Sequence, residues 1–487
     1  MSRKEVAIYA IIMCLSIITP LLFSSNMSWL FTRGDSNVFF LIGKGWMNGL
    51  IPYVDLGDSK GPLLWFIYGV GYLIDNTSYL GIYIIEALFD FCTILCFYKT
   101  VELFVRNRYL SLLSSAIAVV MLYYYGYHME TVSETFNMPF LMLTMYFAIR
   151  CIYFKETCSE SLYYRGAFLT GISTAATILI KYNVTVLIGI MLVFILISVA
   201  ENKKRESVNW WKLFGCYFFG LLLLIIPFII YFSAKGILGN FFHDYFIEIP
   251  ATIENINQEH IYLNSLNFIY GNYTLMVFLC LLGFTSVYIF FKDKAVLPKL
   301  FPIVFFVLSL SILMRNGIFP HYYEPLFVML VFPLVYIMQY CEKSKIGSCC
   351  MMVVFVSVFL GNYGLYYMKG RTLLKSDKDI DQYMKTFNEI ETILSTKENT
   401  TFMFVDGFWG TFGMKSNALP GCKFFMEQAG ATANMLECRN KAIESRSSDF
   451  VILYGNRQES IHKLVKNGYR KVYEGLMDNQ TVSLYQK

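Results

Sequence analysis

The sequence predicts a polytopic α-helical membrane protein with a small α/β domain at its C-terminal end. Of its 487 residues, 56% are hydrophobic and only 15% are charged, and the mean hydropathy is +0.49. Soluble domains usually carry about 25% charged residues. Eleven apolar runs are candidates for membrane-spanning helices, and the chain becomes more polar after Tyr367.

The expected spans alternate with basic connections. With the N-terminus in the cytoplasm, each inner connection carries Lys or Arg, as the positive-inside rule requires. The expected spans are 6–24, 79–98, 110–126, 135–153, 166–181, 184–200, 212–234, 273–291, 300–314, 323–340 and 348–367. We therefore predict an integral protein of the cytoplasmic membrane whose C-terminal domain is extracytoplasmic.

One apolar run is too short to be counted as a span. Residues 62–74 number 13, and about 20 are needed to cross the bilayer core. If this run crossed, the basic connection after the second span would move to the outer side. We expect a re-entrant or interfacial helix, with Trp65, Tyr68 and Tyr72 at the membrane interface.

The expected outer side collects polar features. It receives the first loop (25–78), the loop 235–272, which is expected to cover a site, and the tail. All five histidines also fall there, namely His128, His243, His260, His321 and His462.

We predict two domains, a membrane domain at residues 1–368 and a separate α/β domain in the tail, residues 369–487. Residues 377–397 have apolar side chains at helical spacing, and "TFMFVDGF", "SDFVILYGN", "RKVYEGL" and "TVSLYQ" are typical of short strands. A helix at 457–467 is expected to end at Gly468. Cys422 and Cys438 are either free thiols or a disulfide, and the sequence leaves both open.

Several ionisable residues lie near the expected outer membrane face. At membrane depth such a group costs about 2.5–3.5 kcal/mol, so groups near the bilayer need a partner or a role. These residues are Asp35, Asp58, Lys60, Glu134, Lys181 and Arg315, with His321 and Tyr322 beside the last. Cations there would bind an anionic lipid headgroup, and a carboxylate would accept a proton from an attacking hydroxyl. A lipid-linked sugar phosphate fits this chemistry.

Short motifs in these positions resemble the GT-C glycosyltransferases, the group of the protein O-mannosyltransferases and the lipid A aminoarabinose transferases. "GDSNVFF" and "DSKGPLLWF" are similar to the first outer loop of that family, with its acidic residue and later Lys-Gly-Pro-Leu element. "SETFNMPFLML" resembles the second acidic loop, and "RNGIFPHYYEPLFVML" resembles the Arg…Phe-Pro-His-Tyr turn of bacterial relatives. The resemblance implies a GT-C-like bundle of about 11 helices with juxtamembrane helices in the first outer loop.

The resemblance also implies roles for single residues. Asp35 would be the catalytic base, Glu134 an accessory acid, and Lys60 the contact to the donor phosphate. Arg315 and His321 would be further phosphate or headgroup contacts. Two positions depart from the family: Ser36 replaces the second acid of a common Asp-Glu pair, and only Pro62 stands where some members have two prolines. Asp58 has no counterpart, and it is expected to orient Lys60 or to cap the helix that opens at Gly61–Pro62.

The expected activity is transfer of a sugar from a polyprenyl-phosphate donor to a lipid, glycan or protein acceptor of the cell envelope. The expected partners are that donor, the acceptor and membrane lipids, without nucleic acid. No cofactor is expected, although His243 and Asp244 leave a divalent metal open. The alternatives are a flippase or other transporter of lipid-linked glycans, which needs charged residues deep in its spans, and a glycan polymerase or ligase.

Overall fold

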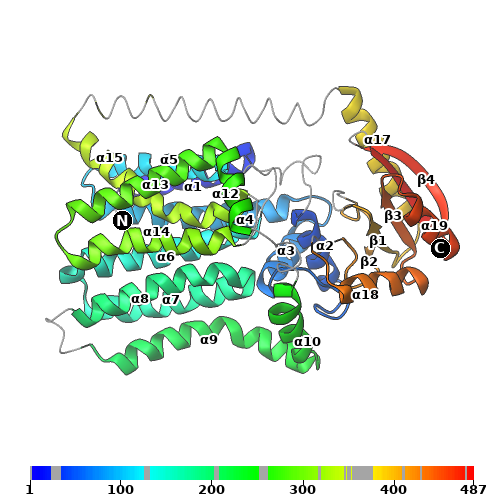
Figure 1. The fold of residues 1–487 in the computed structure, drawn as a ribbon, viewed down its shortest axis with the longest axis horizontal. Helices are drawn as coiled ribbons and strands as arrows, with labels where there is room; N and C mark the ends of the chain where they lie inside the picture. Colours follow the sequence, from blue (N-terminus) through cyan, green and yellow to red (C-terminus); the bar gives the residue numbers. More distant parts are fainter. Residues whose placement is uncertain are drawn as a thin grey trace.

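The structure is a computed structural model that describes residues 3–23, 35–125, 132–201, 208–251, 261–315, 320–344, 347, 353, 377–407, 412–427, 430–477 and 480–487. A bundle of long helices forms one part, and a five-stranded sheet with its helices forms the other (Figure 1). The N-terminus lies at the end of the bundle that is far from the sheet.

The bundle is a membrane domain. Seven helices of the described chain are long and apolar enough to cross a membrane. The helices of the bundle are α1 (Arg3–Phe23), α4 (Leu80–Glu102), α5 (Arg108–Tyr125), α6 (Ser133–Tyr153), α7 (Glu160–Lys181), α8 (Thr185–Glu201), α9 (Trp210–Ala234), α13 (Tyr273–Lys292), α14 (Val296–Met314) and α15 (Val331–Lys343), the last preceded by the 3₁₀ helix η4 (Pro320–Leu330). The expected class is confirmed, while the expected span 348–367 lies outside the described residues.

The apolar stretch Glu160–Glu201 forms two helices that run in opposite directions. A straight helix of 42 residues would be about 63 Å long. Instead, the short helix η2 (Tyr182–Val184) separates α7 from α8, and Lys155, just before α7, lies 3.8 Å from Glu201 at the end of α8. The expected division into 166–181 and 184–200 therefore agrees with the structure, and Lys181 stands at the turn.

The first loop contains two helices, α2 (Asp35–Met47) and α3 (Pro62–Ile74). They cross so closely that a Cβ on Gly43 would lie 2.4 Å from the backbone nitrogen of Gly69. The 13-residue helix has the expected bounds. Of the three expected interface residues, Tyr72 is half-buried, but the other two, Trp65 and Tyr68, are fully buried against protein. They pack against Tyr53 and Phe39, so they are core residues and not interface anchors.

The C-terminal region is the expected α/β unit. Its elements are α17 (Asp377–Leu394), β1 (Thr401–Val405), β2 (Leu419–Pro420), α18 (Ala433–Glu444), β3 (Phe450–Tyr454), α19 (Gln458–Lys466), β4 (Arg470–Met477) and β5 (Gln480–Gln486). The strand order is β2-β1-β3-β5-β4, with β1 parallel to β2 and β3, and β5 antiparallel to β3 and β4. Gly468 has φ +81° just after α19, as a C-terminal glycine should. Cys422 and Cys438 are free thiols.

The sheet and the first loop share one apolar core. Leu41 of α2, Leu64 of α3 and Phe402 of β1 belong to the same buried cluster. Figure 1 shows α2 and α3 between the bundle and the sheet. Lys44 of α2 is buried and donates hydrogen bonds to the carbonyl oxygens of Gly413 (2.6 Å) and Ser416 (2.5 Å). A division of the chain at 368/369 stays a prediction.

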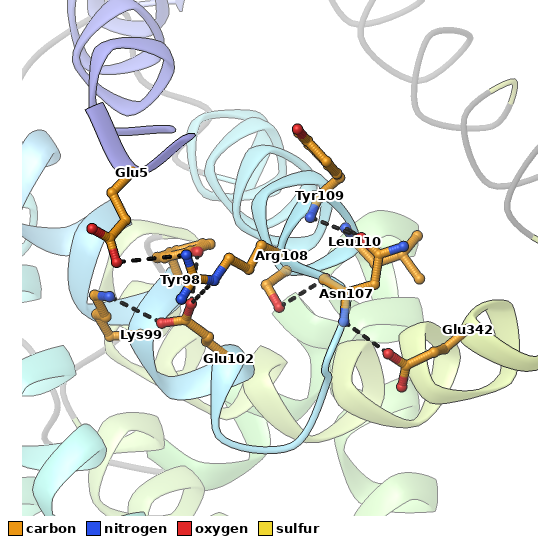
Figure 2. A network of polar contacts seen from close by, with 10 residues as sticks. Glu5, Tyr98, Lys99, Glu102, Asn107, Arg108, Tyr109, Leu110 and Glu342 are labelled. Carbon is orange, nitrogen blue, oxygen red and sulfur yellow. Dashed lines mark hydrogen bonds and ion pairs between the residues drawn. The ribbon is translucent and has the colours of Figure 1, made fainter. Parts of the chain in front are cut away.

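A polar network ties helix ends together at the other end of the bundle (Figure 2). Arg108 at the start of α5 lies 3.5 Å from Glu5 of α1 and 3.2 Å from Glu102 of α4. The backbone N–H of Asn107 donates to Glu342 of α15 at 2.7 Å. This is the end that carries the basic connections expected in the cytoplasm.

Candidate active site

The first acid–base pair joins the start of α2 to the end of the loop that leads into α3. Asp35 is the first residue of α2, and Lys60 lies just before α3. The Asp35 Oδ2 and Lys60 Nζ atoms are 3.7 Å apart, with side chains that are 28% and 10% exposed. Lys60 Nζ also donates to Ser59 Oγ at 2.8 Å and lies 5.4 Å from the ring centre of Phe39.

A glycine brings Lys60 against the end of α7. The backbone N–H of Gly61 donates to the carbonyl oxygen of Ile180 at 2.9 Å. A Cβ on Gly61 would lie 2.1 Å from the carbonyl oxygen of Leu179 and 2.7 Å from the hydroxyl of Tyr245. Only glycine permits this approach, and Pro62 then starts α3 where a missing N–H costs nothing. The Lys-Gly-Pro sequence thus places Lys60 beside the α7–α8 turn.

The second acid–base pair lies at that turn. Lys181 ends α7 and forms an ion pair with Glu134 in the first turn of α6. Both side chains are almost completely buried, and Ser133 Oγ donates to the other Glu134 oxygen at 2.8 Å. Lys181 Nζ also lies 4.2 Å from the ring centre of Tyr322, whose ring contacts that of His321.

The two pairs act on each other electrostatically. Burial disfavours the charged form of Lys60, but Asp35 and Asp58, together with smaller effects of Tyr322 and Glu134, outweigh it and raise its pKa. Lys60 is therefore protonated at any physiological pH. Six of the expected residues, namely Asp35, Asp58, Lys60, Glu134, Lys181 and Tyr322, thus form one group, and His321 contacts it through Tyr322.

Asp58 lies two residues before Lys60 in the same turn, and the two act on each other electrostatically. Burial raises the pKa of the Asp58 carboxyl, while Lys60 and the backbone N–H groups of Ser59 and Lys60 oppose that effect. It does not cap the helix, because the N-cap of α3 is Gly61, without a side-chain hydrogen bond. The other expected role, orienting Lys60, stays a prediction.

Arg315 is not joined to this group by any described contact. It ends α14, its side chain is exposed, and its backbone N–H donates to the carbonyl oxygen of Ile312. Its role as a headgroup contact stays a prediction.

The pair His243 and Asp244 does not extend to a metal site in the described chain. The other oxygen of Asp244 lies 2.5 Å from Lys423 Nζ, and the described residues contain no group of three possible ligands.

Three buried carboxylates were missed by the sequence analysis. Glu324 of η4 and Glu86 and Asp90 of α4 are at most 4% exposed. Glu134, Lys181, Glu86 and Asp90 all act electrostatically on Glu324, so these acids extend the site into the bundle. Two acids inside an expected span are costly, and that signal alone would have found Glu86 and Asp90.

Comparisons with known proteins show the fold to which these residues belong. Residues 59–232 match the sequence model of a family described as dolichyl-phosphate-mannose-protein mannosyltransferase. The crystal structure of ArnT from Cupriavidus metallidurans bound to undecaprenyl phosphate is similar with a TM-score of 0.63 and 10% identity, over 99% of this chain and 98% of that one. The chain has the GT-C fold.

Two further structures share the GT-C fold with this chain. ArnT in the apo state has a TM-score of 0.52 and 11% identity, over 99% of this chain and 97% of that one. The oligosaccharyltransferase from Archaeoglobus fulgidus in its apo form has a TM-score of 0.50 and 12% identity, over 92% of this chain and 69% of that one. No curated protein matches the sequence. The expected GT-C architecture is confirmed, and Lys60, Glu134 and Lys181 lie within the family match while Asp35 precedes it.

Proposed function

We propose that the protein transfers a sugar from a polyprenyl-phosphate donor to a lipid, glycan or protein acceptor on the outer face of the cytoplasmic membrane. The observation that carries the proposal is the Asp35–Lys60 pair beside the Lys181–Glu134 pair on a GT-C fold. The undecaprenyl phosphate bound by the similar ArnT and the description of the matched family support a lipid-phosphate donor.

Asp35 acts as the general base. Its partial exposure leaves a carboxylate oxygen accessible to an acceptor, whose hydroxyl proton that oxygen can take. The acceptor hydroxyl attacks the anomeric carbon of the sugar and gives its proton to Asp35. The bond from that carbon to the phosphate oxygen breaks, and the polyprenyl phosphate leaves with the bonding electrons.

Lys60 and Lys181 bind the phosphate and stabilise the charge that develops on it. The distance of 3.7 Å between Lys60 and Asp35 is longer than the 2.7–2.9 Å typical of a strong charged hydrogen bond. A phosphate oxygen can therefore replace Asp35 as the partner of Lys60. Glu134 holds Lys181 in place and acts as an accessory acid, and Tyr322 packs its ring on the lysine.

A second candidate, transport of a lipid-linked glycan, is favoured by one observation. Glu86 and Asp90 are buried within α4, and carboxylates at membrane depth are typical of transport pathways. Both act electrostatically on Glu324, as do Glu134 and Lys181 of the acid–base group, so no separate charged path is indicated among the described residues. Sugar transfer therefore remains the main proposal.

The test uses purified protein in liposomes with polyprenyl-phosphate donors that carry a radiolabelled sugar, together with a lipid extract of acceptors. We expect a labelled glycolipid or glycan as product. Its new glycosidic bond should survive mild acid, whereas the sugar–phosphate bond of the donor should be hydrolysed. If the intact donor crosses the bilayer and no new glycosidic bond forms, the protein is a transporter and the proposed sugar transfer is wrong. The Asp35→Asn protein should form no product, but it should still bind the donor as the wild type does.

A further inference from the structure

A polar cavity lies in the C-terminal region, away from the residues of the candidate active site. Its volume is about 230 Å³, and it lies at the carboxyl ends of β1 and β3, between α18 and α19. The chain leaves β1 toward β2 on one side, and leaves β3 toward β5 and β4 on the other. Ligands of open α/β sheets bind in the crevice at such a point, where the connections diverge.

The cavity is shaped by left-handed turns after both strands. Asp406 follows β1 with φ +59°, and Gly455 follows β3 with φ +79°. Asp406 Oδ1 lies 3.5 Å from Arg457 Nη1. Its Oδ2 is buried and accepts no hydrogen bond from the described residues. A buried carboxylate oxygen without a donor is costly, so a ligand that donates a hydroxyl there would gain free energy.

The charges that line the cavity balance. Three carboxylates, Asp406, Glu427 and Glu459, face three bases, Arg439, Arg457 and Lys463. The Arg439 guanidinium is held by the carbonyl oxygens of Phe404 (2.8 Å) and Phe424 (3.0 Å), so its orientation is fixed.

This lining selects a neutral ligand that both donates and accepts hydrogen bonds. A phosphate would meet three carboxylates, and a cation would meet three bases. Asn440 and Ser460 add an amide and a hydroxyl. The volume lies below the roughly 300–1,000 Å³ of sites for drug-sized ligands, so it suits a single ring-sized unit. A sugar ring, with neighbouring hydroxyls and no charge, meets all of these conditions.

We infer that this cavity is a binding site for a neutral sugar residue. The origin of this sugar follows from the proposed function, on which the inference rests: the sugar belongs to the acceptor glycan. The cavity holds it while the reactive end of the same glycan reaches Asp35. Asp406 accepts from one hydroxyl, and Arg457 and Lys463 donate to others.

The experiment measures binding without sugar transfer. Full-length protein in lipid nanodiscs is titrated with methyl α-mannoside, methyl β-glucoside, N-acetylglucosamine, mannotriose and chitotriose, and binding is read by saturation-transfer NMR. The variants are Asp406→Asn and Arg457→Gln. The matched control is Lys466→Gln, which changes an exposed base of the same helix α19 outside the cavity lining. Thermal midpoints confirm that each variant is folded.

We expect at least one of these sugars to bind. Its affinity should fall by about five- to tenfold in each cavity variant and stay unchanged in Lys466→Gln and Asp35→Asn. If Lys466→Gln and wild type bind but Asp35→Asn alone loses binding, the sugar occupies the membrane site and the inference fails. It also fails if none of the sugars binds, or if glucose 1-phosphate binds the cavity more tightly than the neutral sugars. If a sugar binds to the cavity but the liposome assay detects no sugar transfer, the proposed function is wrong and the cavity is still a sugar-binding site.

Discussion

At the scale of single residues, Asp35 and Lys60 have different surroundings that fit different tasks. Asp35 is the more exposed partner, while Lys60 is nearly enclosed by Phe39, Ser59 and the carboxylates. An exposed carboxylate can reach an acceptor that arrives from outside. An enclosed cation with little water around it interacts more strongly with a phosphate.

The first prediction concerns the proposed base. Asp35→Asn should lower kcat by about 10²–10⁴-fold, because the amide cannot take the proton of the acceptor. Donor binding should change little. Asp55→Asn is the matched control, because Asp55 lies in the same first loop. Within the described chain its carboxylate accepts the N–H of Ile51 at 2.8 Å, and an amide oxygen can accept that bond as well. Equal losses in the two variants would contradict a catalytic role for Asp35.

Most residues of the candidate site were expected together, but Arg315 was expected with them and is not joined to them by a described contact, and the buried acids were missed. Asp35, Lys60, Glu134 and Lys181 were expected together because polar groups beside apolar runs must share partners. Glu324 was missed because it sits in an aromatic and polar segment, where one more acid is not unusual. Only its position opposite Glu134 and Lys181 gives it weight, and that position is a tertiary property.

At the scale of elements, the contact between Gly61 and the end of α7 fixes the geometry of the site. The loop that carries Lys60 touches the backbone of Leu179 and Ile180 directly. Tyr245, from the loop that was expected to cover the site, donates to the carbonyl oxygen of Ile178 at 2.8 Å. Three segments thus meet around one glycine.

The second prediction tests this contact. Gly61→Ala should raise KM for the donor and lower kcat together by at least about tenfold, since the added methyl group must move Lys60 away from Lys181. The measurement is initial-rate kinetics with the labelled donor. Gly215→Ala is the control, because a Cβ on Gly215 of α9 meets no atom within 4 Å. Normal kinetics in Gly61→Ala would show that the close approach is dispensable.

Helix α2 is held at its far end by a buried lysine, and this gives the third prediction. Burial lowers the pKa of Lys44 to about 8, against the opposing effect of Glu391. Because the folded pKa lies below the unfolded value of 10.5, the unfolded state binds the proton more tightly between those two pH values. Stability should therefore rise with pH from about 8 to 10, by about 1.4 kcal/mol per pH unit at most.

The measurement is the thermal midpoint of wild type and Lys44→Met between pH 7 and 10. The wild type should gain stability relative to the variant over this interval. Parallel curves would mean that Lys44 does not titrate there. At pH 7 the variant should have altered stability but the same dependence on donor concentration, since Lys44 does not belong to the acid–base group.

Elements were predicted where their signals are local. The helix at 62–74 and the split of 166–200 follow from length and from the polar turn Lys181–Asn183. The burial of Trp65 and Tyr68 was not predictable, because an aromatic residue at an interface and one under another helix look alike in sequence. The short strand β2 has only two residues, too few for a periodic pattern.

At the scale of the whole molecule, the C-terminal region is part of the structure that holds the site. It contacts α2 through Lys44 and the loop 49–61 through Gly57, whose N–H donates to Lys423 at 2.9 Å. It contacts the segment after α9 through the Lys423–Asp244 ion pair and the hydrogen bond of Thr432 to Glu248. These contacts join residues far apart in the chain, so no local pattern could have predicted them.

The fourth prediction measures one of these contacts. A double-mutant cycle of Lys423→Met and Asp244→Asn should give a coupling free energy of about 1–3 kcal/mol, because the pair is mostly buried at 2.5 Å. The control pair, Lys441 and Glu437 on α18, is as close at 2.6 Å but exposed to water, so its cycle should give no measurable coupling. A coupling free energy near zero for the Lys423–Asp244 pair would mean that this ion pair does not stabilise the contact between the C-terminal region and the membrane domain.

The hydrogen bond from Lys44 to Gly413 has a consequence for biosynthesis, since it spans 369 positions of the chain. At a ribosomal rate of roughly 5–20 residues per second, Gly413 is made on the order of 20–70 s after Lys44. With the predicted topology, the first loop crosses to the outer side during that interval, with a lysine and an apolar helix face that lack their partners. The nascent protein would therefore expose the region of its candidate active site until translation is almost complete, and we expect its folding to depend on an extracytoplasmic chaperone or on slow docking of the C-terminal region.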